Sequence, residues 1–149
     1  MKKYQRVTHT DTALIGRLID DEGFRGEPYK DTLGHLTVGY GTLFPLSREE
    51  CRSLLSSRLK AKMSALSKES RRRYSVTIST LPKETQRGLF NMAYQLGIGG
   101  LMKFKKMWQA LARRDFATAH DEALDSRWAR QTPQRAQRVA RQLLGGIER

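Results

Sequence analysis

The chain has 149 residues, 38% of them hydrophobic, so it is long and apolar enough to bury a core and is not a disordered polymer. Its 28 lysines and arginines against 15 acids give a net charge of +13, which favours polyanionic partners such as nucleic acid, anionic lipid or an anionic cell wall. One cysteine excludes an intrachain disulfide, and the charged N-terminus, which lacks an apolar run, predicts neither a signal peptide nor a membrane span.

A helix is predicted near the N-terminus. Thr10 or Asp11 can cap a helix that continues to Asp21 and cannot extend comfortably past Gly23. The apolar residues that recur on one face of this helix are Leu14, Ile15, Leu18 and Ile19.

A small sheet and a long helix are predicted next. Glycines punctuate residues 29–43, which also carry Thr, Val and Tyr, and this pattern predicts a short antiparallel hairpin or sheet with a turn at 31–34. Ser47 and Glu50 fit a capping box, which predicts a helix from 48 to about 66. The polar stretch 67–75 is the best candidate for a boundary between two lobes.

The second half of the chain predicts helices almost throughout. Their expected ranges are 83–96, 101–113, 116–124, 127–131 and 133–144. Asp115 is placed to cap the helix at 116–124, Ser126 precedes the short turn at 127–131, and Thr132 is expected to cap the last helix, in which Pro133 suits the first position. The sequence therefore predicts an α+β fold that is mainly α, with a small β-containing N-lobe and a larger helical C-lobe.

Two acids and a hydroxyl in the first lobe could carry chemistry. Glu22 lies at the predicted C-terminal end of a helix, where the helix dipole and apolar neighbours such as Phe24 favour the protonated form that a general acid needs. Asp31 lies in a polar turn, where it should stay ionised, and Thr37 could hold a water against it. Two carboxyls in such different surroundings are typical of a glycosidase pair.

A purely structural explanation of these residues also stays open. Acids near a helix end and in a turn usually face solvent, and an Asp in a turn often accepts hydrogen bonds from its own backbone. Spacing alone does not decide between a catalytic and a structural role.

Two longer motifs resemble the T-even phage lysozyme family. The first is "DEGFRGEPYKDTLGHLTVGYGTLF", residues 21–44, with a Glu after a short helix, then Tyr-x-Asp, then Thr-x-Gly-x-Gly. The second is "SRW..QTP.RA.RV", within residues 126–139, and the likeness extends over residues 91–139. The resemblance implies a lysozyme-like fold in a single domain over 1–149. Its parts would be an N-lobe at about 12–55, a joining helix at about 48–66, and a C-lobe at about 75–149 that includes the N-terminal helix.

The resemblance also implies an activity. The chain would be an endolysin, an inverting muramidase that hydrolyses the β-1,4 bond between N-acetylmuramic acid and N-acetylglucosamine and so lyses the host cell. Glu22 would be the general acid, Asp31 would activate or stabilise the attacking water, and Thr37 would position that water. Thr42 stands where the family more usually has a His.

Further substrate-binding residues follow from the same likeness: Leu43, Tyr94, Gln95, Arg127, Gln131 and Arg135. The first three match positions that line the cleft, and Arg135 matches one that reaches towards the catalytic Glu. Arg127 and Gln131 could face the cleft or its peptide-binding rim, or be structural. Met107 and Glu122 stand at two other positions that match substrate contacts, and neither is the polar residue expected there. Trp128 is expected in the core.

The positive charge has three competing explanations. It could draw a muramidase to anionic murein, bind nucleic acid, or act through the last helix, 133–144, which is cationic and amphipathic and could contact anionic membrane or lipopolysaccharide. A basic non-catalytic module that binds wall, membrane or nucleic acid is therefore the alternative to the enzyme. No DNA- or RNA-binding motif is present, so we expect no specific nucleic acid partner.

The expected partners and location follow from the resemblance. Peptidoglycan would be the substrate, and a monomer would wait in the host cytoplasm until a holin gives it access to the periplasm and the wall. The three histidines show no metal-ligand spacing, and acid-catalysed hydrolysis needs only water, so we expect no cofactor and no metal.

Overall fold

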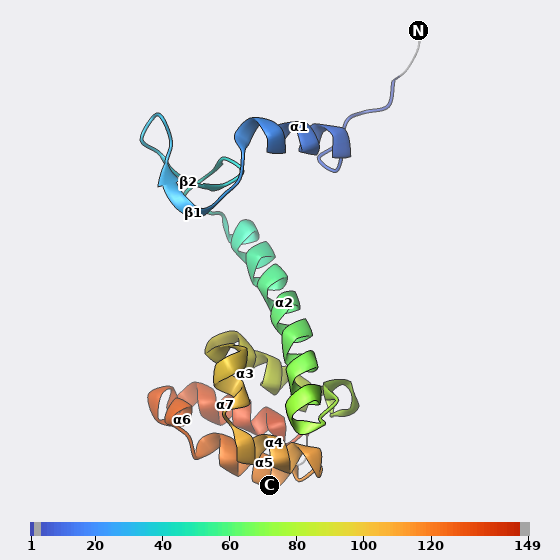
Figure 1. The fold of residues 1–149 in the computed structure, drawn as a ribbon, viewed down its shortest axis with the longest axis vertical. Helices are drawn as coiled ribbons and strands as arrows, with labels where there is room; N and C mark the ends of the chain where they lie inside the picture. The colour runs from blue at the N-terminus through green and yellow to red at the C-terminus, as the bar shows by residue number, and fades with distance from the viewer. Residues whose placement is uncertain (2–3, 147–149) are drawn as a thin grey trace. The chain divides into compact units, whose positions relative to one another are not determined.

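The computed structural model describes residues 1 and 4–146 (Figure 1). Helix α1 (Thr12–Glu22) begins and ends as its capping residues predict. The Asp11 side chain accepts a hydrogen bond from the Leu14 amide at 2.8 Å, and Gly23, with φ 70°, ends the helix. The four apolar residues of its predicted face are 38–49% exposed, and no described residue of α1 is buried.

The N-terminal unit, residues 1–51, continues with an antiparallel sheet of strand order β1-β2-β3. The strands are β1 (Arg25–Lys30), β2 (Leu36–Gly39) and β3 (Thr42–Leu43). Thr37 lies opposite Tyr29 on one side and Leu43 on the other, and at 2% exposure it is the one buried residue among those described in this unit. Of the two predicted alternatives, a hairpin or a small sheet, the structure has the small sheet.

Helix α2 (Arg48–Tyr74) starts with the predicted capping box, in which the Ser47 hydroxyl and Glu50 carboxylate each accept the other residue's amide at 3.1 Å. It extends past the expected end at 66, so residues 67–74 are helical. The reason is tertiary: the Tyr74 hydroxyl donates to the Met102 carbonyl at 2.6 Å, and its ring stacks on Trp108.

The C-terminal unit, residues 52–149, is helical in its described part. After a 3₁₀ turn at Ile78–Thr80 the helices are α3 (Lys83–Met102), α4 (Lys105–Ala112), α5 (Phe116–Leu124), α6 (Arg127–Gln131) and α7 (Pro133–Leu143). Instead of stopping near 96, α3 bends at Gly97, whose φ of 75° only glycine adopts readily, and resumes to Met102. The mainly helical α+β class is confirmed.

A core centred on Trp108 holds this unit together. Trp108 is fully buried and donates its indole N–H to the Leu101 carbonyl at 2.9 Å. Trp128, 4% exposed, packs edge-on to Phe104, in agreement with its predicted core role. The apolar side of α7 is also buried here, through Ala136, Val139, Ala140 and Leu143. In the described part of the chain no helix is both long enough and apolar enough to span a membrane.

The contact between α3 and α7 depends on a glycine. A Cβ at Gly88 would lie 3.2 Å from each of three atoms of α7, including the Val139 carbonyl oxygen. We expect Gly88→Ala to lower the free energy of unfolding by about 1–3 kcal/mol through overpacking, measured by urea denaturation. Gly99→Ala is the control, because nothing lies within 4 Å of its Cβ position and alanine favours helix. Equal stability of the two variants would contradict this packing.

Candidate functional site

Asp31 is held by the backbone of its own turn. Its Oδ1 accepts the amides of Leu33 at 2.9 Å and His35 at 2.8 Å, while its Oδ2 lies 3.5 Å from Nδ1 of His35. The His35 amide is the main reason that the pKa of Asp31 lies below its usual value; burial opposes this, and the Leu33 amide and the charge of a protonated His35 add to it. The carboxyl is therefore anionic, as predicted, and it also makes the turn-type bonds of the structural alternative.

Thr37 is tied to the same turn. Its hydroxyl donates to the His35 carbonyl at 2.9 Å, and that carbonyl also accepts the Asp31 amide at 2.9 Å. Because the hydroxyl proton is committed to the backbone, the Thr37 oxygen faces any other polar group as an acceptor. His35 thus links the predicted base to the predicted water-positioning residue.

Glu22 approaches the opposite end of strand β2. A Cβ on Gly41, in the turn between β2 and β3, would lie 2.5 Å from Oε2 of Glu22. The turn of Asp31 precedes β2, Thr37 lies within β2, and Gly41 follows it. The three predicted residues therefore meet β2 at different points: Asp31 before its start, Thr37 within it, and Glu22 beside the turn that follows it. Glu22 is exposed, and Phe24, which was expected to cover it, is 68% exposed and packs on Tyr40.

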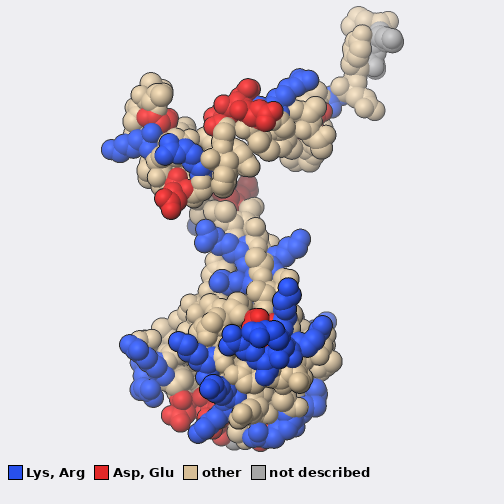
Figure 2. All heavy atoms as spheres, viewed as in Figure 1, with Lys and Arg blue, Asp and Glu red and all other residues tan. Residues whose placement is uncertain are grey.

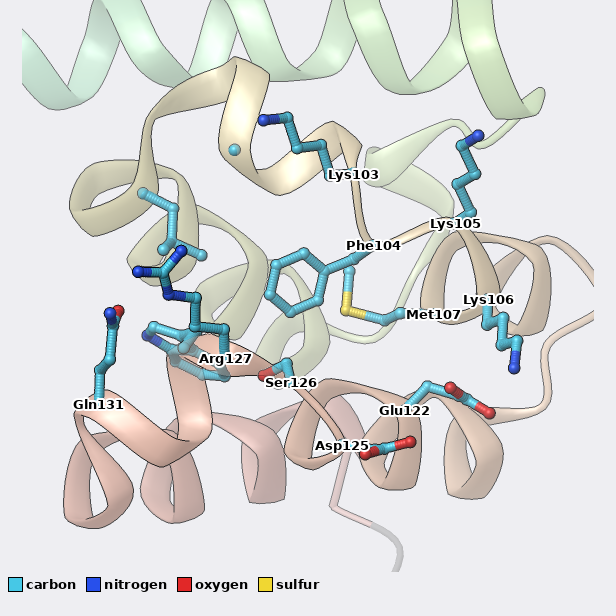
Figure 3. A pocket seen from close by; sticks show the side chains of 13 residues that line it. Lys103, Phe104, Lys105, Lys106, Met107, Glu122, Asp125, Ser126, Arg127 and Gln131 are labelled. Atoms are coloured by element: carbon cyan, nitrogen blue, oxygen red, sulfur yellow. The ribbon is translucent and has the colours of Figure 1, made fainter.

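A second set of predicted residues lines a pocket of about 570 Å³ in the C-terminal unit (Figure 3). Arg127 and Gln131 lie at one end of it, Glu122 lies at the other end, and Met107 lies between them. The wall of the pocket is apolar in the middle and carries charges of both signs at its ends. Such a pocket suits an extended ligand with polar groups at both ends.

The remaining predicted binding residues have other local roles. Gln95 accepts the Trp128 indole N–H at 2.8 Å, and Arg135 donates twice to Oδ1 of Asn91, at 3.1 and 2.9 Å. Tyr94 is 37% exposed, and Leu43 is 52% exposed on β3. None of these four residues is among those that line the pocket.

Comparisons with known proteins identify the family of the chain. A model of the phage lysozyme family matches residues 20–144, a range that contains all three catalytic candidates. The chain belongs to the phage lysozyme family. Probable T4-type lysozymes 2 and 1 of Dictyostelium discoideum are 28% and 30% identical to it, covering 86% and 80% of this chain and 91% and 86% of theirs.

A third relative is the pre-baseplate central spike protein Gp5 of Enterobacteria phage T4. It is 28% identical over 85% of this chain, and the match spans 26% of its own length. The family and these relatives support a lysozyme-type function of the glycoside hydrolase class, and the family implies peptidoglycan as the substrate.

In this member of the phage lysozyme family, the sequence did not predict all residues of the Asp31–Thr37 site or of the C-terminal pocket. It did not find the contact of His35 with Asp31, although a residue four positions on across a glycine turn is a reasonable candidate. It also missed Phe104, Lys106 and Asp125 in the pocket, because the first two lie at the start of α4 and the third follows α5, and no local pattern connects them.

Gly41 is expected to control the position of Glu22. Because Gly41→Ala would place a Cβ against the Glu22 carboxyl, we expect kcat on murein sacculi to fall by roughly 10²-fold. Gly39→Ala is the matched control: its φ of 69° imposes similar backbone strain, but nothing lies within 4 Å of its Cβ position. Equal losses in the two variants would assign the effect to backbone strain alone.

His35 is expected to shift the pH dependence of activity. His35→Gln keeps the backbone amide that dominates the lowered pKa of Asp31 but removes the charge that an imidazole carries in acid. The pKa of Asp31 should rise, so the acid limb of the kcat/KM profile should move to higher pH. His120→Gln, which removes an imidazole beside Asp121, is the control. An unchanged acid limb in His35→Gln would contradict the proposed link.

Proposed function

We propose that this protein is an endolysin: a muramidase that cleaves the β-1,4 bond between N-acetylmuramic acid and N-acetylglucosamine and causes host cell lysis. The observation that carries the proposal is the state of Asp31. Its carboxylate is anionic, Oδ1 accepts two backbone amides, and Oδ2, which lies 3.5 Å from Nδ1 of His35, accepts no described backbone amide. This is the arrangement that a base for water activation needs.

The hydrolysis is proposed to follow an inverting course. Glu22 donates its proton to the glycosidic oxygen as the bond to C1 breaks, while water attacks C1 from the opposite face and gives a proton to Asp31. A water that donates one hydrogen to Asp31 and the other to the Thr37 oxygen has a lone pair left for the sugar. For an inverting mechanism, we expect the two carboxyls to lie roughly 6.5–9.5 Å apart during the reaction.

The pocket of the C-terminal unit supports a peptidoglycan substrate over a plain sugar polymer. A peptide stem carries free amino and carboxyl groups together with apolar methyl side chains. Glu122 and Asp125 suit the amino group, Arg127 suits a carboxylate, and Phe104 and Met107 suit the apolar part. The proposal therefore assigns Arg127 and Gln131 to the peptide and not to the glycan.

The proposed cellular setting is lysis from within. The protein waits as a monomer in the host cytoplasm and reaches the wall when a holin opens the inner membrane. Its net charge of +13 supports rapid encounter with an anionic wall. The buried apolar side of α7 argues against membrane insertion by that helix in the folded protein.

Local wall opening during infection is a second candidate. Its support is the match to the phage T4 spike protein, in which a segment like this chain is about a quarter of a larger protein. Expression of the protein with a holin separates the two roles: an endolysin should clear the culture, whereas a wall-opening protein should be recovered with phage particles.

Glu22→Gln tests the chemistry. Loss of the general acid should reduce hydrolysis of murein sacculi by roughly 10²–10⁴-fold, followed by turbidity and new reducing ends. Binding to sacculi should persist, because the positive charge remains. Glu27→Gln, which changes the same charge on β1, should stay active. A wild-type protein that binds sacculi without releasing reducing ends would instead indicate a non-catalytic wall-binding module.

A further inference from the structure

The positive charge of the chain is concentrated in one unit. Residues 52–149 carry 21 lysines and arginines against seven acids, whereas residues 1–51 carry seven against eight. On the face in view, Figure 2 shows many basic side chains over the C-terminal unit and along α2. Attraction to polyanions is therefore a property of the unit that does not contain the two catalytic carboxyls.

Helix α2 carries much of this positive charge. From Arg52 to Tyr74 it carries eight cations and a single acid, Glu69, which pairs with Arg72 at 2.8 Å and Arg73 at 2.9 Å. The six other cations form no ion pair with a carboxylate among the described residues: Arg52, Arg58, Lys60, Lys62, Lys68 and Arg71. The charge of these six side chains is therefore not balanced by a carboxylate of the described protein.

Two of these cations, together with Arg72, line a groove of about 390 Å³ on the helix surface. The other lining residues are Ser64 and Ser67, so polar contacts occur at i, i+3, i+4 and i+7 on one face. The hydroxyls of both serines make no hydrogen bond within the described residues. The groove therefore offers Lys68 and Arg71, which pair with no carboxylate among the described residues, Arg72, which also pairs with Glu69, and two hydroxyl donors.

The fold itself gives no reason for this combination. Lys68 and its neighbours Arg71 and Arg72 are exposed, and like charges three or four positions apart destabilise a helix. The helix dipole favours cations in the last turn, which accounts for Arg71–Arg73 but not for the serines, since serine is a weaker helix former than alanine. An anionic ligand would explain the groove as a whole.

We propose that the groove of Ser64, Ser67, Lys68, Arg71 and Arg72 binds the phosphate groups of a phosphorylated envelope glycolipid. A phosphate presents three tetrahedral oxygens, which can accept from an ammonium, a guanidinium and hydroxyls that approach from different directions. A carboxylate has two coplanar oxygens and is satisfied by one arginine. Serine hydroxyls also suit the sugar that carries the phosphate.

The choice of an envelope partner rests on the proposed function, whereas the phosphate chemistry of the groove does not. The site also differs from the last helix, whose apolar side is buried in the core. Arg138 and Arg141 of α7 are exposed, so their removal provides a charge-matched comparison with removal of Lys68 and Arg71.

The full-length protein is titrated with phosphatidylcholine vesicles that carry a diphosphorylated glucosamine lipid, and with the same vesicles after phosphatase treatment. We expect binding only before dephosphorylation, and a loss of roughly tenfold or more in Lys68→Gln/Arg71→Gln. Arg138→Gln/Arg141→Gln, with the same net charge, should stay within about twofold of wild type. Inorganic phosphate should displace the protein better than chloride at equal ionic strength.

Ser64→Ala/Ser67→Ala separates the groove from net charge. It keeps every cation and introduces better helix formers, so weaker vesicle binding cannot come from unfolding. Any one of three results would overturn the proposal: equal losses in the two charge variants, unchanged binding in the serine variant, or tighter binding to duplex DNA at equal phosphate and salt.

Murein hydrolysis separates this proposal from the proposed function. Lys68→Gln/Arg71→Gln should still cleave sacculi like wild type. Failure of the wild type to cleave them would count against the proposed function and leave the binding result standing.

Discussion

The two backbone hydrogen bonds to Oδ1 of Asp31 are the constraint on which the proposed catalytic arrangement depends. They fix the turn that joins β1 to β2, and the register of that hairpin then brings Thr37 opposite Tyr29 and directs its hydroxyl to the His35 carbonyl. The donors are main-chain amides, so the base is held by chain geometry and needs no packed side chains around it. Loss of the turn would misplace both the base and the water site.

This constraint explains how a unit with one described buried residue can carry precise chemistry. The N-terminal unit relies on caps, turns and strand pairing, whereas the C-terminal unit buries a core around Trp108 with its indole N–H satisfied. Glycine at 41 allows the Glu22 carboxyl to approach the sheet where any side chain would collide with it. Local geometry positions the proposed acid and base, Glu22 and Asp31, and the helical unit supplies most of the buried apolar surface.

Local signals in the sequence predicted three helix starts, because Asp11, Ser47 and Asp115 each accept a hydrogen bond from the amide three residues on. The predicted cap at Thr132 was wrong: its hydroxyl donates to the Trp128 carbonyl and accepts no amide of α7. The catalytic candidates were also predictable, since they fall in one continuous motif. The helical state of 67–74 was not, because it depends on the contact of Tyr74 with Met102, 28 residues away. The C-terminal pocket was only partly predictable, because its wall combines residues from several helices and depends on how these helices pack.

The two surfaces of the C-terminal unit differ in the kind of recognition they permit. The pocket with Glu122 and Arg127 carries both charges around an apolar middle, so a ligand must match it in length and polarity, which gives selectivity. The groove on α2 carries only positive charge and hydroxyls, and its cations are exposed, so its attraction is long-ranged, salt-sensitive and modest for each contact. An enzyme that works on an insoluble polymer benefits from this division. In the proposed function, weak exposed contacts would keep the protein near the envelope without trapping it, while the pocket and the carboxyls of the other unit would decide what is cleaved.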